Sequence, residues 1–129
     1  MTTHRPVVSD SLPTPAGPYS PGVVYGSLVF VSGQGAVDPA TGLLVGDDVE
    51  SQTEQVLSNI SSILQAAGSS LACVLRCGVF LTDMAEFRKM NAVYERRLGQ
   101  NRPARTTVQV SALPRAGLKV EIDAVAYIP

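Results

Sequence analysis

The stretch RPARTTVQVSALPRAGLKVEID, residues 102–123, contains two predicted strands joined by a segment with proline and glycine. Arg105 opens the first, β-branched run, and Glu121 lies in the second, where apolar and polar residues alternate. Period-two alternation places the apolar set on one face of the sheet and Lys119, Glu121 and Asp123 on the other. Each predicted strand thus carries a charged side chain, Arg105 or Glu121, at a position where a charge suggests a specific role.

A hairpin through residues 111–117 would pair these two strands, with 105 opposite 123 and 107 opposite 121. Arg105 and Glu121 would then be diagonal neighbours on one face, roughly 7–8 Å apart at the backbone. A guanidinium can bind a carboxylate through two hydrogen bonds, and a nearby carboxylate can act as a general base. The pair predicts a site where water attacks a small anionic substrate. A cross-strand salt bridge, or two unrelated surface charges, is the simpler alternative.

Length and composition indicate one folded domain over residues 1–129. The net charge of -1 and pI near 5.7 argue against a protein built mainly to bind nucleic acid or anionic lipid. No apolar segment typical of a secretion signal follows Met1. The longest apolar stretch, residues 71–81, contains Arg76 and is too short to span a bilayer, so we expect a cytoplasmic protein.

The rest of the chain predicts four more strands and two helices. The strands are expected near 5–8, 23–25, 28–32 and 72–82, and the helices over 48–67 and from Asp83 to Gly99. Asp47 or Asp48 begins the first helix, and with Asp47 as N-cap Glu50 would complete a capping-box-like arrangement. Apart from the short edge strand near 5–8 the order is β-β-α-β-α-β-β, which with that strand indicates an α+β fold with a single sheet of about six strands.

Two amphipathic helices can cover only one face of such a sheet. Strand 72–82 nevertheless carries apolar groups on both faces: alternation places Cys73, Leu75, Cys77, Val79 and Leu81 on one, and Val74 and Phe80 with Arg76 on the other. An uncovered apolar face is an interaction surface, so we expect a homo-oligomer in which it meets a neighbouring copy.

Cys73 and Cys77 are expected to be buried thiols. Four residues of strand separate their Cα atoms by roughly 13 Å, which is too far for a mutual disulfide. Their spacing matches no common zinc signature, and the single histidine, His4, lies near the terminus, so no metal site is predicted. A reactive cysteine is the alternative.

Three further segments could contribute to a site. Tyr19, in Gly-Pro-Tyr-Ser, could hydrogen-bond an anion or water, or simply anchor a loop. Ser32 and Gly33 end a strand where free backbone N–H groups can bind a carboxylate. The second helix has a predicted buried stripe formed by Phe87, Met90, Tyr94 and Leu98, and Asn91 lies at its edge, facing either a site or solvent. Four arginines, 96, 97, 102 and 105, could contact RNA phosphates, although 96 and 97 also suit a helix C-terminus.

Taken together, these segments resemble the Rid family of reactive intermediate deaminases, also known as the YjgF or L-PSP endoribonuclease family, and in particular its RidA-type members. The resemblance covers nearly the whole chain: GPYSPGVVYG at 17–26, VFVSGQ at 29–34, QTEQVLSNISSILQAAG at 52–68, VFLTDMAEFRKMNAVY at 79–94, PARTTVQVSALP at 103–114 and VEIDAVA at 120–126. Each segment is weak evidence alone, but their order and spacing are specific.

The resemblance implies a chorismate-mutase-like fold and a homotrimer with sites in the clefts between subunits. It implies hydrolysis of 2-imino acids, or their enamine tautomers, to 2-oxo acids and ammonia without a cofactor. By the family pattern Arg105 binds the substrate carboxylate and Glu121 positions or activates water. The pattern places five more positions in the pocket: Tyr19, Ser32, Gly33, Asn91 and the backbone of Thr107.

Two features depart from that pattern. Arg102 precedes Pro103 where relatives often carry an aromatic or apolar residue, and the connection over residues 99–102 is short. Both bear on the pocket rim and therefore on substrate choice. The resemblance leaves three alternatives: a pathway-specific deaminase for an aminoacrylate- or aminomuconate-like enamine, an endoribonuclease that inhibits translation, and a ligand-binding or chaperone-like oligomer without turnover.

Overall fold

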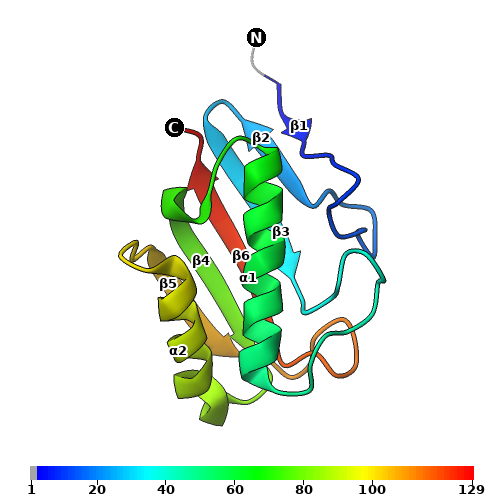
Figure 1. The fold of residues 1–129 in the computed structure, drawn as a ribbon, viewed down its shortest axis with the longest axis vertical. Coiled ribbons are helices and arrows are strands. Elements are labelled where there is room, and N and C mark those ends of the chain that lie inside the picture. The colour runs from blue at the N-terminus through cyan, green and yellow to red at the C-terminus, as the bar shows by residue number, and fades with distance from the viewer. Residues whose placement is uncertain (1–2) are drawn as a thin grey trace.

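Two helices lie side by side across one face of a six-stranded sheet (Figure 1). This computed structural model describes residues 3–129. The elements are β1 (Arg5–Pro6), β2 (Gly22–Tyr25), β3 (Leu28–Gln34), α1 (Val49–Ala66), β4 (Val74–Leu81), α2 (Phe87–Leu98), β5 (Ala104–Gln109) and β6 (Val120–Tyr127), with 3₁₀ turns at Leu71–Cys73 and Met84–Glu86. The predicted α+β class, with one sheet and two helices on one face, is confirmed. In the part described, no helix is long and apolar enough to cross a membrane.

Capping residues set where both helices begin. The Asp48 carboxylate accepts a hydrogen bond from the Ser51 backbone N–H at 2.7 Å, so Asp48 rather than Asp47 is the N-cap of α1. Asp83 accepts from the Ala85 N–H and begins a 3₁₀ turn that leads into α2. At its other end α2 stops at Gly99, whose φ of 61° is a conformation that glycine adopts without strain.

The strand order is β1-β2-β3-β6-β4-β5, which overturns the predicted hairpin between β5 and β6. β5 runs parallel to β4, while β6 lies between β3 and β4 and is antiparallel to both. Parallel neighbours need a crossover connection, and α2 supplies it between β4 and β5. β6 alternates regularly between core and open positions and is central, whereas the polar β5 forms an edge.

A buried glutamine fixes the connection that leads into β6. The Gln52 side chain of α1 donates to the Gly117 carbonyl at 2.9 Å and accepts from the Lys119 N–H at 2.7 Å. Its side chain is fully buried, so these bonds satisfy polar groups that water cannot reach. They hold the start of β6, and therefore Glu121, in a fixed position relative to α1.

The sheet face turned away from the helices, here called the open face, carries apolar side chains. Its exposed large members are Tyr25, Phe30, Val108 and Tyr127. The prediction of a second apolar face is confirmed, and the oligomer inferred from it stays a prediction.

The predicted strict alternation of faces along β4 is wrong at one point. Val74 is buried and Leu75 exposed, because a register shift between Val74 and Arg76 interrupts the pleat.

Candidate active site

Arg105 lies on β5 and points to the helix side of the sheet. Its register partner on β4, Cys77, is buried in the core on that side. The guanidinium carbon lies 4.7 Å from the ring centroid of Tyr94 and 5.6 Å from that of Phe87, both on α2. None of the five ion pairs formed within residues 3–129 includes Arg105. A guanidinium held against two rings without a carboxylate partner is a ready site for an anion.

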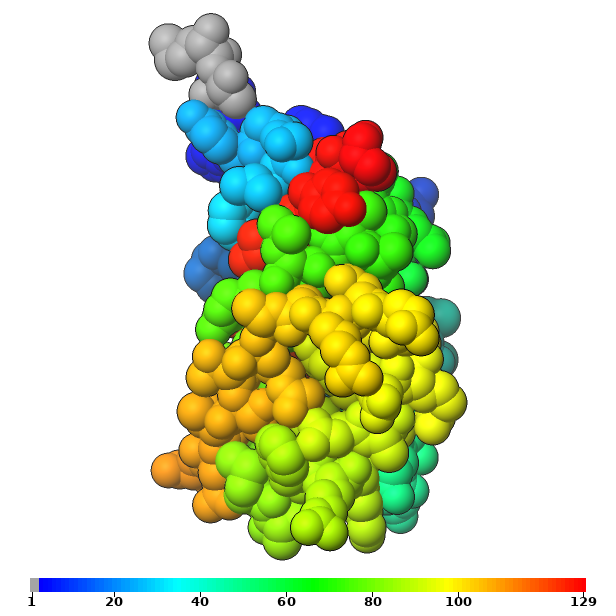
Figure 2. Space-filling view, turned by 90° about the vertical axis from the view of Figure 1, so that its left-hand side faces the viewer, coloured from blue at the N-terminus to red at the C-terminus, as the bar shows by residue number. Residues whose placement is uncertain are grey.

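A hollow of about 320 Å³, here called the arginine hollow, opens beside Arg105. Figure 2 looks onto this side of the molecule, where α2 and the orange β5 frame the depression. The lining residues are Asn91, Tyr94, Glu95, Leu98, Gly99, Asn101, Arg102, Pro103 and Arg105. Of the predicted site residues, Asn91 and Arg105 are thus brought together here. Thr107 is two residues further along β5, beyond the lining.

Glu121 lies on β6 and points to the open face, because its neighbours Val120 and Ile122 are fully buried on the helix side. Its carboxylate rests against Gly33 of β3: a Cβ at that position would lie 2.6 Å from Glu121 Oε2. Position 33 therefore needs glycine so that the carboxylate can approach the backbone. Partial burial raises the pKa of Glu121, and the negative charge of Asp123 raises it further.

A bulge in β3 creates the space around this carboxylate. Val31 pairs with Ala124 and Gln34 with Ile122, so Ser32 and Gly33 together face one residue of β6. The Ser32 hydroxyl donates to the Ser20 carbonyl at 2.7 Å and ties the preceding loop to β3. The Ser32 side chain therefore fixes the position of that loop relative to β3.

Tyr19 lies on the loop that Ser32 anchors. The Tyr19 hydroxyl oxygen accepts from the Ala16 N–H at 3.2 Å, and this leaves its own proton available to a ligand. Tyr19, Gly33 and Glu121 line a second hollow of about 450 Å³, here called the glutamate hollow. Its other walls come from the end of β3, from loops and from three residues that precede β6: residues 13–16, Pro21, 34–35, 37–42, Pro114, Arg115 and Leu118.

The predicted diagonal contact between Arg105 and Glu121 is wrong. The two residues lie on strands separated by β4, and their side chains leave opposite faces of the sheet. The physical reason is the β4–α2–β5 crossover, which takes β5 to the far side of β4 and away from β6. Within residues 3–129, a cation without an ion-pair partner and a carboxylate therefore lie on opposite faces of the sheet.

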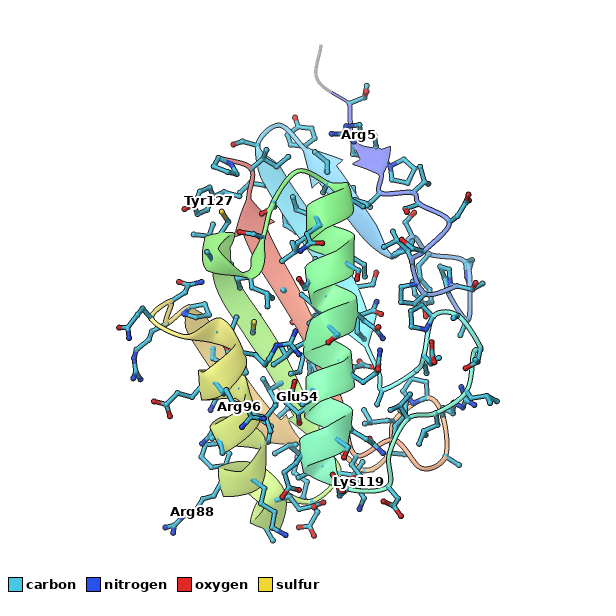
Figure 3. The ribbon with its side chains drawn as sticks, viewed as in Figure 1. Arg5, Glu54, Arg88, Arg96, Lys119 and Tyr127 are labelled. Carbon is cyan, nitrogen blue, oxygen red and sulfur yellow. The ribbon has the colours of Figure 1, made fainter. Side chains whose placement is uncertain are left out.

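Much of the arginine cluster is used within the fold. Arg96 and Arg97 of α2 both bind the Glu54 carboxylate of α1, Arg97 at 2.7 Å, and Figure 3 shows Arg96 reaching toward Glu54. These bonds lower the pKa of Glu54, with the Arg97 hydrogen bond as the largest cause. Arg102 lies 3.5 Å from the Glu95 carboxylate. The four arginines therefore do not present a continuous basic surface.

Residues 9–128 match the protein family described as Endoribonuclease L-PSP. A protein named Reactive Intermediate Deaminase A, from Arabidopsis thaliana, is 40% identical over 122 residues, 95% of this chain and 65% of that protein. The chain belongs to the Rid, or L-PSP, family. A RutC family protein of Pyrococcus horikoshii is 46% identical to this Rid chain over 94% of its length and 95% of the relative. The structure of TdcF from E. coli with bound serine superposes with a TM-score of 0.89 at 37% identity, covering 95% of this chain and 98% of that one.

The comparisons confirm the family that the sequence motifs indicated, and some relatives in this family are named deaminases. Sequence reasoning missed two residues that contact Arg105 in this Rid protein. Phe87 and Tyr94 were interpreted only as part of the buried stripe of α2. Their spacing of seven places them on one face of the helix, and this signal was available, but the strand below that face was not known.

Proposed function

We propose that this Rid protein hydrolyses small 2-imino acids, or their enamine tautomers, to 2-oxo acids and ammonia. The observation that carries the proposal is Arg105: a cation without a carboxylate partner, beside a hollow, in a chain of a family with members named reactive intermediate deaminases. A 2-imino acid carries a carboxylate next to an electrophilic C=N carbon, which suits such a cation. The relative TdcF was solved with serine, also a small molecule with a carboxylate.

We infer that two copies of the chain complete each site. Within residues 3–129 no ion pair includes Arg105 or Glu121, so these two groups, here called half-sites, are complementary in charge. The open face carries Glu121 beside exposed apolar side chains, as a subunit interface would. A homotrimer in which the open face of one copy meets the edge strand β5 of the next would bring a cation and a carboxylate to one cleft.

In this mechanism Arg105 holds the substrate carboxylate through two hydrogen bonds and fixes the orientation of the C=N carbon. The Glu121 carboxylate accepts a proton from water as the oxygen attacks that carbon. Glu121 passes that proton to the imine nitrogen, so the tetrahedral intermediate carries a hydroxyl and an amino group. Glu121 then takes the hydroxyl proton and gives it to the amino nitrogen, so the C–N bond breaks, ammonia leaves and the carbonyl of the 2-oxo acid forms. We expect Tyr19 and the backbone at Gly33 and Thr107 to hydrogen-bond substrate or water.

The proposal is tested by ammonia release from imino acids that an amino acid oxidase generates in the same cuvette. Addition of the protein is expected to accelerate release from 2-iminopropanoate and 2-iminobutanoate above the spontaneous rate. A panel of larger and charged imino acids would define the preference that Arg102 and the short 99–102 connection create at the rim. Release at the spontaneous rate for every substrate would contradict the proposal.

The proposed homotrimer can be tested separately from the activity. Sedimentation at micromolar concentration is expected to give a single species of three chains, because the open face buries apolar area only against another copy. The Phe30→Glu variant places a charge in that face and is expected to shift the protein toward monomer. The same substitution at exposed Leu43, which lies on a loop away from the sheet, is the matched control and should leave the trimer intact. A monomeric wild-type protein would refute the shared site.

The structure offers less support for the endoribonuclease that the family description names. Three of the four clustered arginines, Arg96, Arg97 and Arg102, face acidic partners within the chain. Phosphate binding would have to compete with those contacts. RNA cleavage that survives in an Arg105→Ala, Glu121→Ala double variant would indicate a contaminant or a different site.

A further inference from the structure

We propose that Tyr94 and Phe87 are positioning residues that hold the Arg105 guanidinium for its carboxylate ligand. The inference rests on the proposed function for the identity of that ligand. It adds a role for two aromatic residues of α2 that the fold alone would assign to packing. In this arrangement the ring faces hold the cation from one side while its N–H groups stay available for the substrate.

The geometry around Arg105 supports this assignment. The guanidinium carbon lies 4.7 Å from the Tyr94 centroid and 5.6 Å from the Phe87 centroid, both within the range of a cation–π contact. No ion pair within residues 3–129 holds Arg105, so the rings are its observed charge-stabilising contacts. A carboxylate partner would have occupied the N–H groups that a substrate needs. Aromatic partners stabilise the cation without occupying them.

The environment of the Tyr94 hydroxyl indicates that the ring, rather than the hydroxyl, positions Arg105. That oxygen is buried and makes no hydrogen bond of good geometry within residues 3–129, although the Cys77 thiol and the Arg105 guanidinium lie near it. Burial of a phenol without a partner is unfavourable, and phenylalanine would fill the same space without that penalty. The hydroxyl oxygen is also shielded from solvent, whereas the Tyr94 residue as a whole lines the arginine hollow. What tyrosine and phenylalanine share at this position is a ring face beneath Arg105.

The test uses binding rather than turnover, with 2-oxobutanoate as the probe and titration calorimetry as the measurement. Tyr94→Leu is expected to raise the Kd about three- to thirty-fold, the effect of losing one cation–π contact. Tyr94→Phe is expected to bind within about two-fold of wild type, because the ring face is retained. Phe87→Leu is expected to have a smaller effect than Tyr94→Leu, since its ring lies further from the cation.

Met90→Ala is the matched control, because Met90 is a fully buried residue of the same helix and does not line the arginine hollow. It should lower the melting temperature as Tyr94→Leu does and leave the Kd unchanged. Wild-type affinity in Tyr94→Leu would overturn the proposal. Equal losses in Tyr94→Phe and Tyr94→Leu would overturn it too, by showing that the hydroxyl is required.

NMR of the Arg105 side chain separates this proposal from the proposed function. Ring currents should shift the Arg105 Nε–H proton in wild type and Tyr94→Phe, and the shift should fall in Tyr94→Leu. Its absence in the wild type would overturn the stacking. A shifted, ordered Arg105 in a trimer that binds no 2-oxo acid would instead refute the carboxylate role and the proposed function, while the stacked arrangement would stand.

Discussion

Arg105→Ala is expected to remove nearly all acceleration of 2-iminobutanoate hydrolysis. The side chain supplies two charge-assisted hydrogen bonds to the substrate carboxylate, and their loss corresponds to about 10²- to 10⁴-fold in kcat/KM. Most of that loss should appear as a higher KM, with a lower kcat as well because an unanchored C=N carbon is poorly aligned with water. Ammonia release over a range of substrate concentrations measures both terms.

Two variants make the Arg105 result specific. Arg105→Lys keeps the charge but loses the planar fork and its stacking on Tyr94, so it should recover only a small part of the activity. Arg88→Ala removes an exposed arginine of helix α2 and should behave as wild type; Figure 3 shows Arg88 pointing outward at the end of α2. An Arg105→Ala protein that keeps wild-type kcat/KM would rule out the proposed carboxylate site.

Local patterns predicted which segments form strands and helices, because periodicity and capping are properties of neighbouring residues. They did not predict which strands pair. Residues 111–117 looked like a hairpin loop, yet the strand that follows lies between β3 and β4. A strand–helix–strand unit from β4 to β5 was present in the sequence and favours parallel pairing. The wrong choice came from weighing adjacency along the chain above the burial that a central strand gains.

Local sequence patterns likewise predicted only part of the site, because the positions of its residues depend on strand pairing. Alternation correctly placed Glu121 on the face opposite Val120 and Ile122, but the face of Arg105 depends on how β5 pairs. The close approach of Gly33 to a carboxylate follows from a bulge in β3, and no residue pattern marks that bulge. The shared site that we propose needs residues from two copies, so the pattern of one chain cannot assemble it. Only the motifs that resemble the family linked these positions.

Glu121→Gln is expected to lower kcat by about 10²- to 10⁴-fold, the contribution of a positioned general base. The amide keeps the shape of the side chain against Gly33 and cannot accept a proton from water. The wild-type rate should rise with pH as Glu121 ionises. Burial and the charge of Asp123 raise the pKa of Glu121, so this rise should be centred above the ordinary value of 4.5. Corrections for spontaneous imine hydrolysis at each pH are essential to the measurement.

Asp123→Asn tests the origin of that pH dependence. The Asp123 carboxylate accepts the Gly78 N–H at 2.7 Å, and the asparagine amide oxygen can accept it too. Only the charge is lost, so the pKa of Glu121 should fall and the acid limb of the rate profile should move to lower pH. An unmoved limb, or an active Glu121→Gln protein, would show that another group accepts the proton.

Glu121→Gln should raise the stability of the protein at neutral pH while it lowers the activity. An acid whose pKa is raised by folding costs stability when it is ionised, so the native protein loses stability as pH rises from the unfolded value of Glu121 through its folded value. Glu121→Gln should therefore melt higher than wild type at neutral pH, and the gain should vanish in acid, where glutamate is protonated in both states. Exposed Glu50→Gln in the first turn of α1 should instead lower stability slightly, because it removes a charge that favours the helix dipole. A carboxylate that costs stability and is kept for its chemistry is what an active-site base requires.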